Sequence, residues 1–188
     1  MIRDDFRCYR YIFAIDPGYS FKNGAGYAIF DHETFKLIAC GIVRPFAPGM
    51  DDYQAAIEIA NKLRQIWEKH VGFSFDPVCL VIEGQIIYPF SKINPEPLIK
   101  LARLSGMLLR DYKTPEKNVL TPCPGQWKGN SAKIDTANLV LENLDPWSIR
   151  RLNNDLSEIP KFLHHNVYDA VGLGLWAIEN FTKENFKK

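Results

Sequence analysis

Two short apolar runs that each end in an acidic residue constrain the fold of this chain most strongly. Residues 11–15 read Tyr-Ile-Phe-Ala-Ile and lead to Asp16, and residues 78–82 read Val-Cys-Leu-Val-Ile and lead to Glu83. A wholly apolar run such as the second is typical of a central strand that is covered on both faces. Because a carboxylate at the end of a buried strand is costly unless something pairs with it, the two runs predict a site where charge is compensated.

The residues around these runs predict a mixed α/β domain. Three stretches rich in β-branched and aromatic residues are joined by short turns, which predicts an antiparallel meander over residues 8–15, 24–30 and 35–43. Helical spacing follows at residues 51–70, 94–112, 131–144 and about 164–180, with short strands at 78–83 and 118–121. The polar stretch after Asp145-Pro146 has no clear assignment up to Pro160. This order predicts a five-stranded mixed sheet, in which parallel strands extend the meander and helices cover both faces.

Length and composition predict one domain over residues 1–188, with a core at about 9–180 and a frayed, charged tail. The chain has 188 residues, of which 46% are hydrophobic, enough for one well-buried core. We expect a cytoplasmic protein without a membrane span, because we find neither a long apolar stretch nor a signal peptide. The four cysteines are widely separated and lack zinc-site spacing, so we expect reduced packing residues.

The formal net charge of +1 is weak for a protein that binds nucleic acid. Local clustering can override the total, and cations do concentrate in the second half of the chain, at Lys113, Lys117, Lys128, Lys133, Arg150, Arg151 and Lys161. A nucleic-acid partner therefore stays compatible with the composition.

A third acid, Asp169, lies in a helical segment and is followed by apolar residues, so it is not part of a polar face. If the first and fourth strands lie side by side, as the proposed sheet has them, Asp16, Glu83 and Asp169 together meet the requirement for two Mg²⁺ ions about 4 Å apart, the arrangement that activates water for phosphodiester hydrolysis. Mn²⁺ suits the same oxygen ligands. Taken alone, each acid also has a common structural role: Asp16 can form a turn, Glu83 can be a solvated strand end, and Asp169 can be a surface charge.

Two neighbours of Asp169 are further candidates for this site. His165 lies one helical turn before Asp169 and Asn166 lies three residues before it, so either side chain can point to the same place. A histidine there can act as a general base or orient the attacking water, whereas the alternative is a residue that bonds locally at the helix start.

The motifs resemble the RuvC family of Holliday junction resolvases from about residue 11 to 178. The resemblance rests on Ile-Asp-Pro-Gly at 15–18, Gly-Tyr-Ala-Ile at 26–29, Ile-Glu-Gly-Gln at 82–85, the helical stripe within 94–106 and Tyr-Asp-Ala at 168–170. It implies a ribonuclease H-like fold, a homodimer and Mg²⁺-dependent cleavage of four-way DNA junctions, with Asp16, Glu83 and Asp169 as metal ligands. The compact size favours a phage-type member of this family.

The resemblance also implies residues that contact DNA, and it has two departures. The family places an acid or a histidine where this chain has Asn166, so the fourth ligand stays open between Asn166 and His165. The family's aromatic wedge after the glutamate is displaced here, and Tyr88 is the candidate for stacking, with core anchoring as its alternative. The residues Trp127, Lys128 and Lys133 resemble a loop and helix start that bind phosphate, with a solvated loop whose Trp127 packs inward as the alternative.

The sequence thus predicts a structure-selective DNA endonuclease that resolves Holliday junctions or related branched DNA by symmetric nicks with 5′-phosphate ends. The helix at 94–112 would supply the dimer contacts. Two alternatives belong to other classes. One is a nucleotide phosphotransferase or ATPase of the actin-like superfamily, which normally needs two such domains, and the other is a non-catalytic module that binds branched nucleic acid.

Overall fold

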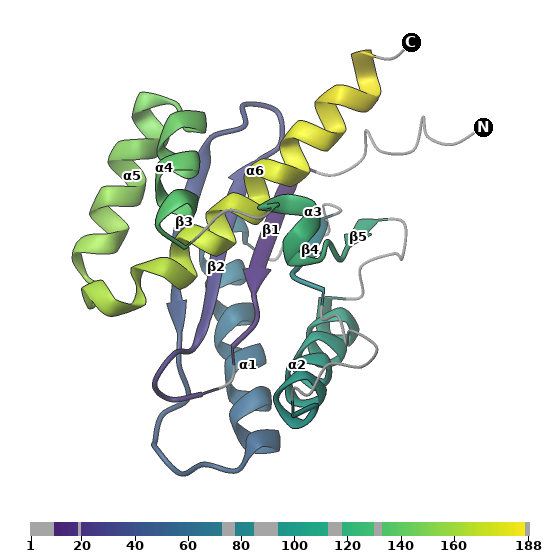
Figure 1. Ribbon diagram of the computed structural model, residues 1–188, viewed down its shortest axis with the longest axis vertical. Coiled ribbons are helices and arrows are strands. Elements are labelled where there is room, and N and C mark those ends of the chain that lie inside the picture. The colour runs from purple at the N-terminus through teal and green to yellow at the C-terminus, as the bar shows by residue number, and fades with distance from the viewer. Residues whose placement is uncertain are drawn as a thin grey trace.

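The structure is a computed structural model that describes residues 10–18, 20–72, 78–84, 94–112, 118–129 and 133–186. At 111–112, 133–135 and 181–186 it describes the backbone alone. In these ranges one mixed sheet is packed between two layers of helices (Figure 1). No helix in this part of the chain combines the length and apolar character that a bilayer span requires.

The sheet has five strands in the order β3-β2-β1-β4-β5. Its members are β1 (Tyr11–Asp16), β2 (Ala25–Asp31), β3 (Leu37–Val43), β4 (Val78–Ile82) and β5 (Val119–Leu120). The first three strands are antiparallel, whereas β4 is parallel to β1 and β5 is parallel to β4. The predicted meander and its parallel extension are therefore confirmed. Because β1 and β4 run in the same direction, Asp16, the last residue of β1, and Glu83, the residue after β4, lie at the same ends of neighbouring strands.

Helices α1 (Asp52–Val71) and α2 (Glu96–Tyr112) cover one face. Asp51 caps α1 by accepting hydrogen bonds from the amides of Tyr53 and Gln54, as its position before the helix predicts. The sequence predicts an apolar stripe on this helix that includes Ala102 and Leu108. Of the described α2 side chains, Leu104 and Leu108 are buried, whereas Ala102 is exposed, so the stripe is confirmed in part.

The opposite face carries the short helix α3 (Pro124–Trp127) and the helices α4 (Lys133–Asn143), α5 (Pro146–Ser157) and α6 (His164–Phe186), with a 3₁₀ turn, η3 (Lys161–Leu163), before α6. Helix α6 continues to Phe186, so the prediction that this helix ends near residue 180 was wrong. Gly174 lets α6 approach the sheet, since a Cβ there would lie 2.3 Å from the ring of Phe30. Gly172, two residues earlier, lies against the ring of Trp127 and not against the sheet.

Helix α5, which the sequence left unassigned, covers the edge strand β3. The hydroxyl of Ser148 accepts a hydrogen bond from the amide of Leu37 (3.0 Å), and the carboxylate of Asp155 accepts one from the amide of Cys40 (3.0 Å). These side chains satisfy amides of an edge strand that a further strand would otherwise bind.

Candidate active site

The ends of β1 and β4 bring Asp16 and Glu83 onto neighbouring strands. Ile15 pairs with Ile82, and the amide of Glu83 donates to the carbonyl of Ile15 (3.1 Å). Along β1, Ile12 and Ala14 belong to the core cluster that faces α6, and side chains alternate between faces, so Asp16 also faces α6. The same alternation on β4 places Glu83 on this face, after Cys79 and Val81.

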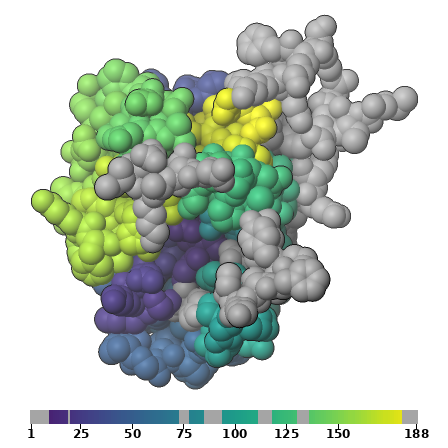
Figure 2. Space-filling model, viewed as in Figure 1, coloured from purple at the N-terminus to yellow at the C-terminus, as the bar shows by residue number. Residues whose placement is uncertain are grey.

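Helix α6 begins directly over these strand ends. Gly26, which is paired with Asp16, has no room for a side chain, because a Cβ there would lie 2.0 Å from the carbonyl oxygen of Asn166. The first turns of α6 therefore pack against the strand ends, and Asp169 follows one turn later. Figure 2 shows the result on one face of the molecule, where purple residues from the start of the chain lie beside yellow-green residues from its end.

Glu83 is held by the segment that follows β5. The amide of Gly84 donates to the carbonyl of Pro122 (2.8 Å), which fixes the backbone just after Glu83. The indole Nε1 of Trp127 donates to Oε1 of Glu83 (3.0 Å). Burial raises the pKa of Glu83, the hydrogen bond from Trp127 and the charge of Lys128 oppose that rise, and the nearby Asp169 adds to it. The net pKa lies above the ordinary glutamate value.

Lys128 links the two acids. Its Nζ lies 3.4 Å from Oδ2 of Asp169 and 3.9 Å from Oε1 of Glu83, and it also lies 4.6 Å from the centre of the Trp127 ring. An ammonium group thus stands between two largely buried carboxylates. Sequence reasoning associated Lys128 with phosphate and did not foresee this contact.

Trp127 packs inward, which is the alternative that the sequence left open for this loop. Its side chain is 7% exposed and packs in the core cluster against Gly172. An indole buried in this way has little surface to offer DNA, and its observed polar contact is the hydrogen bond to Glu83. This contact gives Trp127 a positioning role toward Glu83, and its contact with DNA stays a prediction.

Asn166 and His165 begin the same helix in different settings. The side-chain amide of Asn166 donates to the carbonyl of Asn23 (2.8 Å), so this buried residue ties the β1–β2 turn to α6. His165 is partly exposed. The preceding histidine is structural, since Nε2 of His164 contacts the carbonyl of Ile159 at 2.8 Å.

The remaining predicted site residues are described in part. Tyr88 lies outside the described residues, and Lys133 starts α4 without a described side chain. Within the described ranges, no three His, Cys, Asp or Glu side chains are grouped closely enough to hold a metal ion. Glu83 and Asp169 both lie near the ammonium group of Lys128, and Asp16 is the last residue of the neighbouring strand, β1. The joint role of the three acids as metal ligands stays a prediction. A cavity of about 640 Å³ opens beside Glu83, with Ser105 of α2 and Thr121 among its lining residues.

Comparison with solved structures identifies the architecture. The chain is similar to the RuvC structure of Thermus thermophilus with a TM-score of 0.58, at 18% identity, over 92% of this chain and 96% of that chain. The chain has a RuvC fold. It is also similar to the yeast mitochondrial Holliday junction resolvase Ydc2, with a TM-score of 0.57, at 15% identity, over 95% of this chain and 83% of that chain. No protein-family model and no curated protein matches the sequence. The α/β, ribonuclease H-like fold predicted from the sequence is confirmed.

Proposed function

We propose that the chain is a structure-selective DNA endonuclease that resolves Holliday junctions or related branched DNA by metal-dependent hydrolysis. The observation that carries the proposal is the pair of carboxylates, Glu83 and Asp169, gathered around one cationic group at the strand ends of a RuvC fold. Both similar structures are named as RuvC or as a Holliday junction resolvase, which favours this function over the actin-like phosphotransferase alternative.

The donor set fits Mg²⁺. Asp16, Glu83 and Asp169 offer carboxylate oxygens, which Mg²⁺ and Mn²⁺ prefer. Glu83 and Asp169 together attract a cation, and Lys128 occupies that place with its ammonium group. We assign the three acids to holding two Mg²⁺ ions, with Mn²⁺ as a substitute and His165 or Asn166 as a further ligand. Bound ions would supply an activated water and stabilise the leaving oxygen.

The other residues would position the substrate. Lys128 can turn from the carboxylates to a DNA phosphate, because it is a flexible point charge with three donors. Lys133, at the start of α4, would bind the next phosphate. His165 is placed to accept a proton from the attacking water. The products would be symmetric nicks with 5′-phosphate ends, and Tyr88 would stack on a base at the branch point.

A homodimer would place two such sites on opposed strands of a two-fold junction. Helix α2 is the proposed interface. On α2, Ile99 is 47% exposed, and Ala102 and Arg103, within one turn of it, are also exposed. These residues offer a small apolar surface with a cation at its border.

The test is incubation with labelled four-way junction, duplex and single strand, with and without Mg²⁺. We expect symmetric nicks that are confined to the junction and that require the metal. Asp16→Asn and Glu83→Gln should abolish cutting and keep junction binding, whereas Glu142→Gln, which changes an exposed carboxylate of α4, should cut normally. Full cutting by either site variant would refute the assignment.

One observation favours the non-catalytic alternative. No three acidic or histidine side chains are grouped for a metal among the described residues. A module of that kind would bind the junction with wild-type affinity and show no Mg²⁺-stimulated cleavage under any condition of the same assay.

A further inference from the structure

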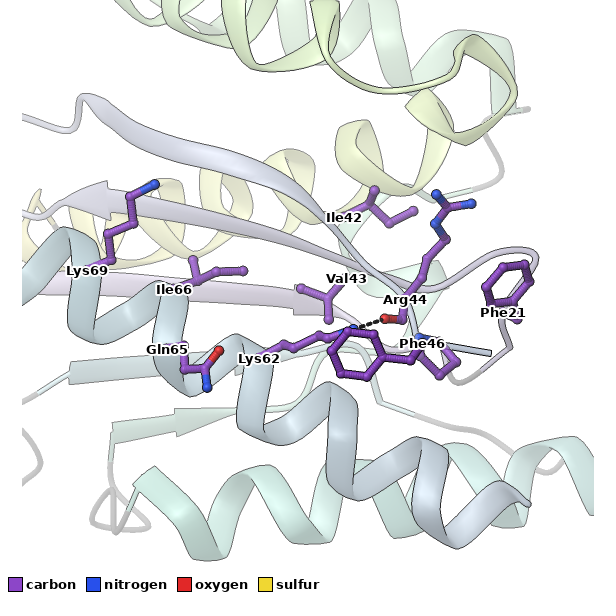
Figure 3. Close-up of a pocket in the computed structure, with 10 residues that line it drawn as sticks. Phe21, Ile42, Val43, Arg44, Phe46, Lys62, Gln65, Ile66 and Lys69 are labelled. Atoms are coloured by element: carbon purple, nitrogen blue, oxygen red, sulfur yellow. Dashed lines mark hydrogen bonds between the residues drawn. The ribbon is translucent and has the colours of Figure 1, made fainter. Parts of the chain in front are cut away.

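A second surface with nucleic-acid chemistry lies between the edge strand β3 and helix α1. A cavity of about 560 Å³ is lined there by two aromatic side chains, Phe21 and Phe46, and by three cationic ones, Arg44, Lys62 and Lys69 (Figure 3). The described lining residues include no acid. We refer to this surface as the β3–α1 groove.

Phe46 is exposed and yet fixed in place. Its side chain is 77% exposed, and its amide donates to Oε2 of Glu58 (3.1 Å). Nζ of Lys62 lies 3.6 Å from the centre of the Phe46 ring, while it also binds Oε1 of Glu58 (2.7 Å) and the carbonyl of Arg44 (2.8 Å). Because the lysine covers one face of the ring, the other face is presented to solvent. The solvent-facing side of the ring can therefore stack on a flat ligand.

Arg44 and Phe21 form the other end of the groove. The Arg44 guanidinium lies 5.7 Å from the centre of the Phe21 ring. Gly24 makes room for this arrangement, since it has a φ of +68° and a Cβ there would lie 2.6 Å from Cγ of Arg44. The turn that carries Phe21 is also the one whose Asn23 carbonyl is bound by Asn166 of α6.

The groove opens at the same strand ends as the carboxylates, but on the face of the sheet that α1 covers, whereas the carboxylates lie on the face that α6 covers. Val43, just before Arg44, pairs with Ala25, and the next residue of β2, Gly26, pairs with Asp16. The ends of β1 and β3 are thus two strand spacings apart, about 10 Å. Lys62 and Lys69 are seven residues apart on α1, so the groove extends by about 10 Å along the helix.

We propose that the β3–α1 groove binds an unpaired DNA segment, with a base stacked on Phe46 and phosphates bound by Arg44 and Lys69. Exposed aromatic rings beside cations are the features by which proteins hold single strands, because every unpaired base offers a flat face. In a duplex the base faces are covered by their neighbours, and the rings would have no ligand. The inference rests on the proposed function for the source of the strand, which would be DNA opened beside the cleavage site, and its test does not require cleavage.

The test measures the binding of a fluorescent single-stranded oligonucleotide and of a matched duplex in EDTA, so that no metal contributes. Phe46→Ala and Phe46→Leu should each weaken single-strand binding about tenfold, and Phe46→Trp should retain it. Lys69→Ala should reduce the slope of log affinity against log salt by about 0.7, the value for one phosphate of a single strand. Thermal unfolding should be unchanged in the Phe46 variants, because the ring is exposed.

Matched controls lie at the other end of β3. Lys36 and Trp147 form a similar pair, with Nζ 5.8 Å from the ring centre and a ring that is 43% exposed. Lys36→Ala and Trp147→Ala should bind the single strand as the wild type does.

Wild-type single-strand affinity in Phe46→Ala would overturn the inference. An equal loss of duplex affinity, or a Phe46→Leu variant that binds as well as Phe46→Trp, would also overturn it, since both outcomes exclude base stacking. Normal junction cleavage together with unaffected groove variants would refute this inference alone. If the wild type never cleaves a junction and the groove variants still lose single-strand binding, the nuclease proposal would be refuted and this inference would stand.

Discussion

Replacing Lys128 by methionine removes the positive charge between Glu83 and Asp169 and keeps most of the side chain's volume. Lys128 lies 3.4 Å from Asp169 and 3.9 Å from Glu83, and the side chains of the acids are 13% and 15% exposed. Exposed pairs contribute about 0.2–1 kcal/mol, and breaking a fully buried pair costs about 3–5 kcal/mol. For this intermediate burial we expect a loss of about 2 kcal/mol, since two like charges are left facing each other.

Thermal unfolding followed by circular dichroism measures this loss. For a chain of this size a loss of about 2 kcal/mol lowers Tm by roughly 4–8 °C in EDTA. Mg²⁺ should then raise Tm of Lys128→Met by more than it raises Tm of the wild type, because the lysine no longer competes for the carboxylates. At about 100 times its Kd, a ligand of the folded state adds about 2.7 kcal/mol of stability.

Lys100→Met is the matched control. Lys100 also lies between two carboxylates, at 2.7 Å from Asp52 and 2.8 Å from Glu96, and its side chain is 20% exposed against 21% for Lys128. Mg²⁺ should give this variant no extra stabilisation over the wild type. Equal Tm values for wild type and Lys128→Met in EDTA, or an equal effect of Mg²⁺ on both, would refute the reasoning.

Three other predictions concern the site and its support. Trp127→Phe keeps the buried ring and removes the donor to Glu83, so urea unfolding should show a loss of about 2 kcal/mol, and an unchanged midpoint would contradict the positioning role. Gly174→Ala should lose about 1–3 kcal/mol, because its Cβ would meet Phe30, whereas Gly106→Ala on α2, with nothing within 4 Å, should gain up to about 1 kcal/mol. The pKa of Glu83 is higher in the folded state than in the unfolded state, so on acidification the folded state binds the proton first. The free energy of unfolding should therefore rise as the pH falls from above the folded pKa to the ordinary glutamate pKa. In EDTA, Glu83→Gln should therefore be more stable than the wild type at neutral pH, and the difference should shrink on acidification; a difference that grows would contradict the shift.

The strands could be predicted because their signal is local. The β-branched and aromatic residues of the first strands, their short turns and the apolar run at β4 predict both the meander and the central position of β1, and with them the neighbouring ends of Asp16 and Glu83. Helix α5 was missed because Asp145-Pro146 was taken only as a break. The same two residues start a helix, since Asp145 caps it through the amides of Trp147 and Ser148, and proline suits the first turn.

The contacts within the site depend on tertiary packing and could not be predicted in the same way. A Trp-Lys pair in a loop does not indicate which side chain turns inward, and only the packing of Trp127 against Gly172 decides it. The β3–α1 groove was also missed, because its residues come from three separate segments. The available signal was the Arg-Pro-Phe sequence at residues 44–46, followed by Lys62 and Lys69 seven residues apart on one helix.

The hydrogen bonds from α5 to β3 have a consequence for how the protein behaves in concentrated solution. Ser148 and Asp155 occupy amides of one outer strand, and the opposite outer strand, β5, has two residues. Neither border of the described sheet thus offers a long row of open backbone groups on which further copies can stack. We therefore expect the native protein to resist cross-β aggregation, and Asp155→Ala, which frees the Cys40 amide, to promote it.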